Sequence, residues 1–114
     1  MAGFVYRILL ESEWRAMLAD GLFHGGELDR RDGFIHLSSG AQVAGTLSAY
    51  FTGRSDVVVL EIDAECIAPE LRYEPSRNGE LFPHLYGSLP LAAVVRVVED
   101  AQPGESVTCR ARSP

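Results

Sequence analysis

The sequence contains no lysine, and all ten of its basic residues are arginines, set against sixteen acidic residues and a formal net charge of −6. A protein that holds nucleic acid through generic phosphate contacts needs a basic face, so this balance argues against that class. It leaves room for a small anionic ligand, because a few arginines can gather locally in an acidic protein. We therefore expect a small-molecule partner and no generic nucleic-acid binding.

Cysteine and long apolar runs are also scarce. The two cysteines, Cys66 and Cys109, are too few for a disulfide framework and lack the spacing of a metal site. The longest uncharged apolar runs, Val57–Leu60 and Leu91–Val95, are far shorter than the roughly 20 residues that span a bilayer. Arg7 interrupts the opening apolar stretch, which is not typical of a signal peptide. We expect a cytoplasmic protein with free thiols, no membrane partner and no metal.

The length of 114 residues, with 46% hydrophobic and 23% charged residues, is typical of one globular domain. We expect that domain to occupy residues 1–100. Residues 101–114 form either a tail or a short final strand at Ser106–Arg110. The chain has no internal repeat and no phosphate-binding glycine loop of the G-x-G-x-x-G or G-x-x-x-x-G-K-[ST] type, which removes the commonest nucleotide-binding motifs.

Two main helices are predicted, both in the N-terminal half. Ser12 is typical of an N-cap and Gly21 of a helix end. Ser39, with Gln42 three residues later, forms the pattern of a capping box, and the apolar positions behind it predict a helix that ends at Gly53.

Strand patterns dominate the second half, and Leu22–Gly33 is predicted to be loop or short irregular structure because of its glycines. The predicted strands are Phe4–Leu10, Phe34–Ser38, Val57–Asp63, Leu71–Glu74 and Leu91–Val98. This order favours a compact α+β fold with two small bent sheets over a doubly wound array, which would need more crossover helices.

The segment Asp32–Ser38 is the most informative candidate site. Strand alternation places Ile35 on one face and His36 with Ser38 on the other, beside the start of the next helix. A helix N-terminus favours anions. In one interpretation His36 and Ser38 contact a polar ligand. In the other, Ser38 helps to cap the helix and His36 is a buried, hydrogen-bonded histidine.

A second candidate is Leu81–Gly87, where Pro83 favours extended backbone. Alternation then places Phe82, His84 and Tyr86 on one face. Two rings beside an imidazole could stack on a base or on nicotinamide while the histidine forms a hydrogen bond. The alternative is an aromatic part of the core in which His84 bonds a backbone carbonyl.

Charged residues of the preceding strand form a third candidate. Arg72 and Glu74 share a face, and Arg77 follows them. A carboxylate there can stabilise an oxocarbenium ion or bind ribose hydroxyls, and arginine can hold a diphosphate with two hydrogen bonds. The alternative is a surface ion pair worth under about 1 kcal/mol. His24 is predicted to be a loop residue. The acidic stretch before Cys66 would raise the pKa of the Cys66 thiol and weaken that thiol as a nucleophile.

The motifs resemble a known family. Asp32-Gly-Phe-Ile-His-Leu-Ser38, Gln42 with Thr46, the Arg-Tyr-Glu run that ends at Glu74, and Phe82-Pro-His-Leu-Tyr-Gly87 occur in the order seen in the bacterial domain-of-unknown-function family 952 (DUF952). The resemblance covers about Phe4 to Val98. That family is grouped with the ADP-ribosyltransferase-like superfamily, which includes toxins, poly-ADP-ribose polymerases and RNA 2′-phosphotransferases.

The resemblance implies an ADP-ribosylation-like fold of two small sheets around a cleft that holds NAD or ADP-ribose in active relatives. It also implies residue roles. Active relatives carry functional residues at three strand positions. Arg7 matches the first of these positions, Ser38 with His36 matches the second, and Glu74 matches the third. The chain lacks the His-Gly-Thr and Ser-Thr-Ser stretches of those relatives. Arg7, His36, Arg72 and Arg77 together imitate the histidine-and-arginine set of the RNA 2′-phosphotransferases.

Two hypotheses follow. The first is an enzyme that transfers an ADP-ribosyl or phosphate group, with NAD or ADP-ribose as its ligand. In it His36, His84 and Glu74 are catalytic. Its ligand-binding residues are Arg7, Ser38, Gln42, Arg72, Arg77, Phe82 and Tyr86. The second is a non-catalytic module that binds an anionic or nucleotide-like small molecule in the same cleft.

Overall fold

The computed structural model describes residues 3–99 and 108–111, and these residues combine short antiparallel sheets with three α-helices. The predicted α+β class is therefore confirmed. The strands are β1 (Phe4–Leu10), β2 (Leu22–Phe23), β3 (Ile35–His36), β4 (Val57–Asp63), β5 (Leu71–Pro75), β6 (Leu81–Leu85), β7 (Leu89–Pro90), β8 (Val94–Glu99) and β9 (Thr108–Ala111). The helices are α1 (Glu11–Asp20), α2 (Glu27–Asp32) and α3 (Val43–Tyr50), and 3-10 turns occupy Gly40–Gln42, Ala64–Glu70, Arg77–Gly79 and Leu91–Ala93.

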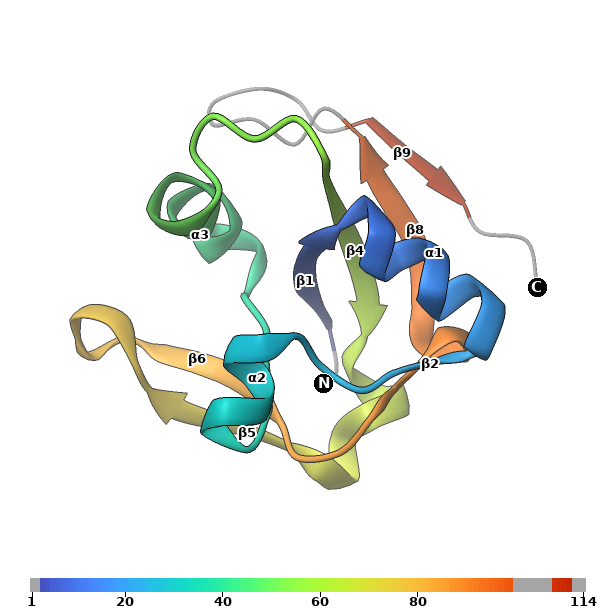
Figure 1. The fold of residues 1–114 in the computed structure, drawn as a ribbon. Helices are drawn as coiled ribbons and strands as arrows, with labels where there is room; N and C mark the ends of the chain where they lie inside the picture. Colours follow the sequence, from blue (N-terminus) through green and yellow to red (C-terminus); the bar gives the residue numbers. More distant parts are fainter. Residues whose placement is uncertain (1–2, 100–107, 112–114) are drawn as a thin grey trace.

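The largest sheet has the strand order β1-β4-β8-β9, and helices α1 and α3 lie to either side of it (Figure 1). Both faces of β4 are covered, which explains its nearly continuous aliphatic run. Leu60 and Ile62 face the core that contains Met17 of α1. Val59 faces a second cluster, with Ile8, against α3. The predicted strands Phe4–Leu10 and Val57–Asp63 are confirmed residue for residue.

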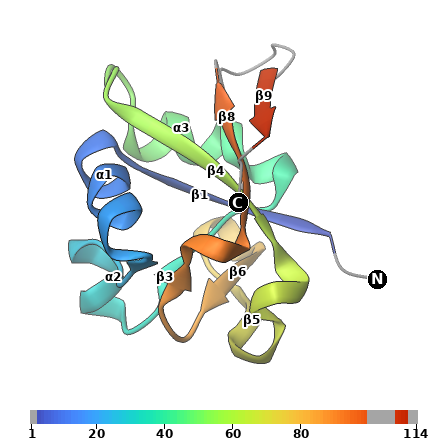
Figure 2. The ribbon, with the colours of Figure 1, turned by 90° about the vertical axis from the view of Figure 1, so that its right-hand side faces the viewer.

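Two smaller sheets lie below the large one, with orders β3-β6-β5 and β2-β7 (Figure 2). The chain after β3 joins the large sheet through a bridge in which Tyr6 and Ser38 exchange backbone hydrogen bonds of 2.7 and 2.8 Å. The described residues thus form three sheets where two were predicted. The additional one is the short pairing of Leu22–Phe23 with Leu89–Pro90.

Helix α1 ends as predicted but begins differently. Gly21 adopts φ 83°, the left-handed conformation that ends a helix and favours glycine. The predicted N-cap at Ser12 is wrong, because Leu10 occupies that position. A side chain of the first turn does the capping instead, since Glu13 Oε1 accepts a 2.9 Å hydrogen bond from the Leu10 N–H.

Helix α2 lies inside Leu22–Gly33, so the predicted loop is wrong for these six residues. The helix is ELDRRD, which has no apolar periodicity to reveal it. Asp29 begins it by accepting a 2.6 Å hydrogen bond from the Gly26 N–H. Gly33, at φ 86°, ends it. A side-chain cap and tertiary contacts therefore make a helix where sequence periodicity does not.

The start of helix α3 keeps part of the predicted pattern. Gln42 Oε1 accepts a 2.9 Å hydrogen bond from the Ser39 N–H, as in a capping box. The first turn is 3-10, so α3 itself begins at Val43, and its C-cap is Phe51, two residues before the predicted end at Gly53.

Three predicted strands have different bounds. Phe34–Ser38 shortens to β3, because the chain pairs with β6 for only two residues before it turns to bridge β1. The predicted strand Leu91–Val98 opens with a 3-10 turn, so β8 begins only at Val94. Strand β5 extends one residue beyond the predicted end at Glu74. Strand β9 pairs with β8, and residues 106 and 107 of the predicted Ser106–Arg110 lie outside the described residues. Within the described part of the chain, no helix is long and apolar enough to cross a membrane.

Candidate functional site

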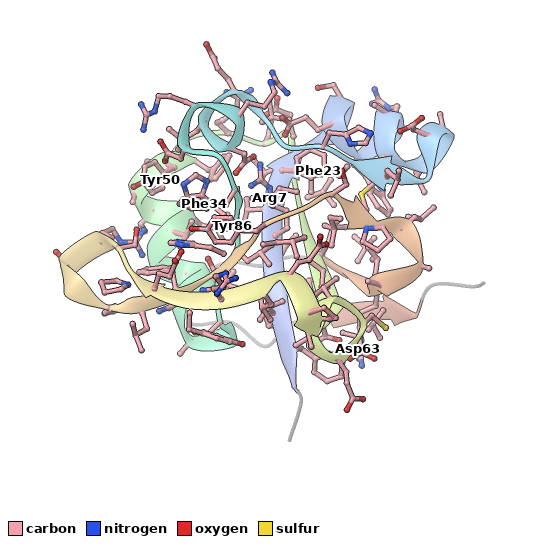
Figure 3. The ribbon with its side chains drawn as sticks, turned by 90° about the horizontal axis from the view of Figure 1, so that it is seen from below. Arg7, Phe23, Phe34, Tyr50, Asp63 and Tyr86 are labelled. Atoms are coloured by element: carbon pink, nitrogen blue, oxygen red, sulfur yellow. The ribbon has the colours of Figure 1, made fainter. Side chains whose placement is uncertain are left out.

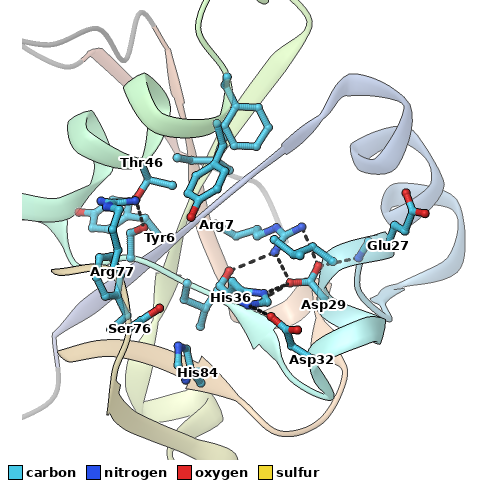
Figure 4. Close-up of a pocket in the computed structure, with 18 of the residues that line it drawn as sticks. Tyr6, Arg7, Glu27, Asp29, Asp32, His36, Thr46, Ser76, Arg77 and His84 are labelled. Atoms are coloured by element: carbon cyan, nitrogen blue, oxygen red, sulfur yellow. Dashed lines mark hydrogen bonds and ion pairs between the residues drawn. The ribbon is translucent and has the colours of Figure 1, made fainter. Parts of the chain in front are cut away.

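A cleft of about 490 Å³ lies where β1, α2, β3, α3 and β6 meet (Figure 4). Each of these five elements contributes polar or aromatic side chains to the cleft. The walls include Tyr6, Arg7, Asp29, Asp32, His36, Ser38, Thr46, Tyr50, Arg77, Phe82 and His84. The cleft therefore gathers residues from across the sequence into one place.

One wall is a closed network around a buried carboxylate. Asp29 is 3% exposed and forms a two-bond ion pair with Arg7, in which both N···O distances are 2.9 Å. Asp29 Oδ1 also accepts hydrogen bonds from His36, at 2.9 Å from the backbone N–H and 2.7 Å from Nδ1. The other ring nitrogen of His36 lies 3.0 Å from Asp32 Oδ2. His36 is thus held between two carboxylates, and both ring nitrogens have partners.

This network sets the charge of Asp29. Burial by itself raises the pKa of a carboxyl group, but the hydrogen bond from His36 and the charge and hydrogen bonds of Arg7 outweigh it. The pKa of Asp29 is therefore held well below its usual range. The ion pair is a permanent part of this wall at neutral pH, and the Arg7 guanidinium also lies 4.8 Å over the Phe23 ring.

The floor of the cleft carries a second histidine with a different environment. His84 Nδ1 donates a 2.7 Å hydrogen bond to Glu74 Oε1, because a carboxylate can only accept. Tyr86 donates to the same oxygen at 2.8 Å, and these bonds from His84 and Tyr86 lower the pKa of Glu74. The His84 ring stacks on Phe34 with centroids 4.0 Å apart, and its buried Nε2 has no hydrogen-bond partner within residues 3–99 and 108–111.

The opposite wall carries an arginine that makes no ion pair among the described residues. The Arg77 guanidinium lies 5.0 Å from the Phe82 ring and 5.9 Å from the Tyr50 ring. Its Nη2 donates a 3.4 Å hydrogen bond to Thr46 Oγ1, which lies 3.1 Å from Ser38 Oγ. Two rings and a chain of hydroxyls thus position a cation for which the described part of the chain provides no ion-pair partner.

The structure brings most of the predicted site residues together. The cleft walls contain Arg7, His36, Ser38, Arg77, Phe82 and His84. Glu74 and Tyr86 do not line it but lie behind His84, to which Glu74 is bonded. Figure 3 labels the Tyr86 and Phe34 rings, whose centroids are 5.3 Å apart.

Besides Tyr86, two predicted ligand-binding residues lie outside the cleft. Gln42 donates to the backbone oxygen of Leu81 at 2.8 Å, and exposed Arg72 lies 5.7 Å from the Tyr86 ring. His24 is also exposed, and its Nδ1 lies 2.7 Å from Ser88 Oγ. Burial and the charge of Asp63 raise the pKa of Cys66, in the direction that the sequence predicted.

Comparison with known proteins fixes the family. The model of the family described as "Protein of unknown function (DUF952)" matches residues 8–97. The chain belongs to the DUF952 family. This assignment confirms the resemblance drawn from the sequence motifs, and the matched span contains every residue of the cleft named above except Tyr6 and Arg7. No curated protein matches the chain.

Solved structures of one bacterial protein are similar to this chain. The crystal structure of protein CC0527 from Caulobacter crescentus is 41% identical, covers 88% of this chain and 90% of that one, and has a TM-score of 0.81. A double mutant of CC0527 gives a TM-score of 0.80 at the same identity and coverage. The solution NMR structure of CC0527 is 42% identical, covers 82% of this chain and 81% of that one, and has a TM-score of 0.74.

Three site residues of this DUF952 chain escaped the sequence analysis as functional candidates. Asp29 lies in the segment predicted to be loop, and only the short helix α2 places it against Arg7. Thr46 was part of the family motif, but its contact with Arg77 depends on how α3 packs. Phe34 belongs to the first candidate segment, and its stacking on His84 follows from the pairing of β3 with β6.

Proposed function

We propose that this DUF952 protein binds a nucleotide-like anionic small molecule in the cleft, with NAD and ADP-ribose as the first candidates. In this proposal it is an ADP-ribosyltransferase-like protein that transfers an ADP-ribosyl or phosphate group. The sequence resemblance supports the placement in that superfamily. The charges and rings of the cleft support the class of ligand.

Arg77 is the observation that carries the proposal. The other arginines of the walls have aspartate partners, since Arg7 pairs with Asp29, Arg31 pairs with Asp32, and Arg54 pairs with a neighbour outside the cleft. Arg77 makes no ion pair among residues 3–99. A guanidinium held against aromatic rings without a counter-charge is arranged to bind a phosphate through two hydrogen bonds. The rings beside it offer a surface for a base.

His84 supplies the group that moves a proton in this proposal. Glu74 accepts a hydrogen bond from its Nδ1–H, which orients the ring and leaves Nε2 without a hydrogen-bond partner among the described residues. Such a histidine is suited to general acid–base catalysis near neutral pH. Glu74 is then a positioning residue, because its carboxylate is bonded to His84 and Tyr86 and does not line the cleft.

A non-catalytic binding module is the second candidate, and the Arg7 wall favours it. Both ring nitrogens of His36 and both oxygens of Asp29 already have partners within the protein. A wall that is saturated in this way can shape a ligand site without taking part in a reaction. In this candidate the same ligands bind and remain unchanged.

A thermal-shift titration with NAD, ADP-ribose and a 2′-phosphorylated oligonucleotide tests the ligand class. A ligand at about 100 times its Kd adds roughly 2.7 kcal/mol, which raises the Tm by several degrees in a domain of this size. We expect such a shift in the wild type, its loss in Arg77→Gln and its retention in Arg72→Gln. Arg72 is the matched control, because it is an exposed arginine outside the cleft.

No shift with any of the three ligands in the folded wild type would remove the proposed ligand class. When a ligand binds, incubation for several hours with analysis of the products separates the two candidates. A product that forms in the wild type and not in His84→Ala identifies an enzyme. Binding without a product identifies the module.

A further inference from the structure

Gly45 is a residue of α3 that the proposed function does not yet explain. It is the third residue of the helix, and it is exposed to solvent. Glycine is one of the least favourable residues inside a helix, because it loses the most backbone freedom on folding and has no side chain to pack. A glycine at an exposed helical position therefore calls for a neighbouring group that uses the space it leaves.

That neighbouring group is the guanidinium of Arg77. A Cβ atom added at Gly45 would lie 3.2 Å from Arg77 Nη2. Apart from the adjacent residues and the backbone of α3 itself, no other atom of the described residues would lie within 4 Å of it. Thr46, the next residue, accepts a 3.4 Å hydrogen bond from the same nitrogen (Figure 4). Gly45 and Thr46 together form the α3 seat for this guanidinium.

Arg77 reaches the α3 seat from another part of the chain. It begins the 3-10 turn between β5 and β6, and its guanidinium lies 5.0 Å from the centroid of the Phe82 ring on β6. A hydrogen bond ties the two segments together, because Gln42, directly before α3, donates to the backbone oxygen of Leu81 at 2.8 Å. A side chain at position 45 would therefore displace the flexible end of Arg77 before it displaced either backbone.

The placement of this guanidinium matters for an anion. A guanidinium binds a phosphate through two parallel hydrogen bonds, and these form only when its planar edge faces the phosphate oxygens. A displaced Arg77 would lose this alignment together with its hydrogen bond to Thr46. Binding would weaken although the charge of Arg77 is unchanged.

We infer that Gly45 is a positioning residue of the cleft, because its missing side chain lets the Arg77 guanidinium lie against α3 where it pairs with a phosphate group. The inference rests on the proposed function, in which Arg77 holds the anion. It gives a binding role to a position that does not line the cleft. The size of the side chain at position 45 then sets the affinity for the ligand.

Substitutions of increasing size at position 45 test the inference by isothermal titration calorimetry with ADP-ribose on the intact chain. Gly45→Ala should bind about threefold more weakly than the wild type, and Gly45→Leu about tenfold, because the larger side chain displaces Arg77 further. The Tm of both variants should equal or exceed that of the wild type, since alanine and leucine favour a helix more than glycine does.

Ser48→Ala and Ser48→Leu are the matched controls. Ser48 is exposed on the same helix and does not line the cleft, so both variants should bind ADP-ribose as the wild type does. Wild-type affinity in both Gly45 variants would overturn the inference. A lower Tm in Gly45→Ala would overturn it too, because the glycine would then serve the packing of the helix and not the placement of Arg77.

A measurement on the ligand-free protein separates this inference from the proposed function. The Nε–Hε resonance of Arg77 in a proton–nitrogen correlation NMR spectrum is identified by its absence from Arg77→Gln. It should shift in both Gly45 variants and keep its position in both Ser48 variants, and an unchanged resonance in the Gly45 variants would overturn the inference. If the resonance shifts but the wild type binds no ADP-ribose, the placement of Arg77 by Gly45 is upheld and the proposed ligand is wrong.

Discussion

Asp29 shows how a single residue acquires its properties from its partners. Its carboxylate is 3% exposed, and it accepts hydrogen bonds from Gly26, which directly precedes α2, from His36 of β3 and from Arg7 of β1. Burying an unpaired carboxylate would be strongly unfavourable, so its negative charge is tolerated only because these donors surround it. The residue therefore connects β1, α2 and β3 along one wall of the cleft.

The depressed pKa of Asp29 predicts sensitivity to acid. The pKa of the folded form is lower than the unfolded value of about 3.9, so the unfolded state binds the proton more readily. Asp29 therefore contributes stability that is fully present above about pH 4 and is lost as the pH falls toward the folded pKa. Urea unfolding from pH 7 to pH 2 should show the free energy of unfolding decreasing below about pH 4.

Asp29→Asn isolates this contribution. At pH 7 it should cost about 3–5 kcal/mol, because Arg7 is left buried without its counter-charge. In this variant the free energy of unfolding should decrease less steeply below about pH 4 than it does in the wild type. Asp32→Asn is the control, since Asp32 is more exposed and its substitution should lower the free energy of unfolding much less than Asp29→Asn does at pH 7. Equal losses in the two variants would show that Asp29 does not hold this wall together.

At the scale of elements, α2 depends on its ends more than on its sequence. Five of its six residues are charged and the sixth is a leucine, and its start relies on the glycine pair before it. Gly25 adopts φ 101°, which side-chain-bearing residues rarely adopt, and an added Cβ would lie 2.9 Å from Asp29 Cβ. Only glycine allows the chain to turn this closely against the buried aspartate.

Gly25→Ala should therefore destabilise the protein by more than Gly33→Ala. Gly33 also has a positive φ, at 86°, but an added Cβ there would contact nothing within 4 Å. The loss of stability in the Gly33 variant measures backbone strain alone, which is about 1 kcal/mol. The Gly25 variant has the same kind of strain and, in addition, a steric clash with Asp29. Chemical denaturation of both variants measures the difference, and equal losses would contradict the close approach seen at Asp29.

At the scale of the whole molecule, the large sheet has a core on each face. Leu60 of β4 is fully buried among residues that include Leu9 of β1 and Met17 of α1. Val59, its neighbour, faces the other cluster with Val98 of β8. A strand that is covered on both sides links the helices and the cleft walls into one cooperative unit.

Leu60→Ala should cost about 2–5 kcal/mol of unfolding free energy, because it leaves a cavity at the centre of the sheet. Leu81→Ala is the matched control: Leu81 is also a strand leucine, but it is 57% exposed. That variant should stay within about 0.5 kcal/mol of the wild type. Urea unfolding followed by tryptophan fluorescence measures both, and a small effect at Leu60 would place the core elsewhere.

The elements that the sequence predicted well are those whose local pattern agrees with their tertiary surroundings. Phe4–Leu10 and Val57–Asp63 are rich in β-branched and aliphatic residues, and the two strands pair with each other along their whole length. The elements that were missed or shortened depend on distant partners. Helix α2 needs Asp29 held by Arg7, and β3 is cut short because Ser38 bridges Tyr6.

In the candidate site too, local patterns predicted some contacts, and others depend on distant partners. Alternation along β6 correctly associated Phe82 with His84, because side chains two positions apart on a strand share a face whatever surrounds the strand. The same rule placed Glu74 beside Arg72 but could not show that its carboxylate is bonded to His84 on the neighbouring strand. That contact follows from the antiparallel register of β5 and β6, in which Arg72 pairs with His84.

Local patterns in the sequence were enough to predict the α+β class, the family and several polar residues of the cleft, because strand alternation and compact motifs do not depend on distant partners. Tertiary structure decided which of these residues are free to act. His36 is occupied on both ring nitrogens, His84 keeps an unpartnered one, and Arg77 has no counter-charge among the described residues. The physical reason is that hydrogen-bond satisfaction depends on groups far apart in the chain, which only the fold brings within reach.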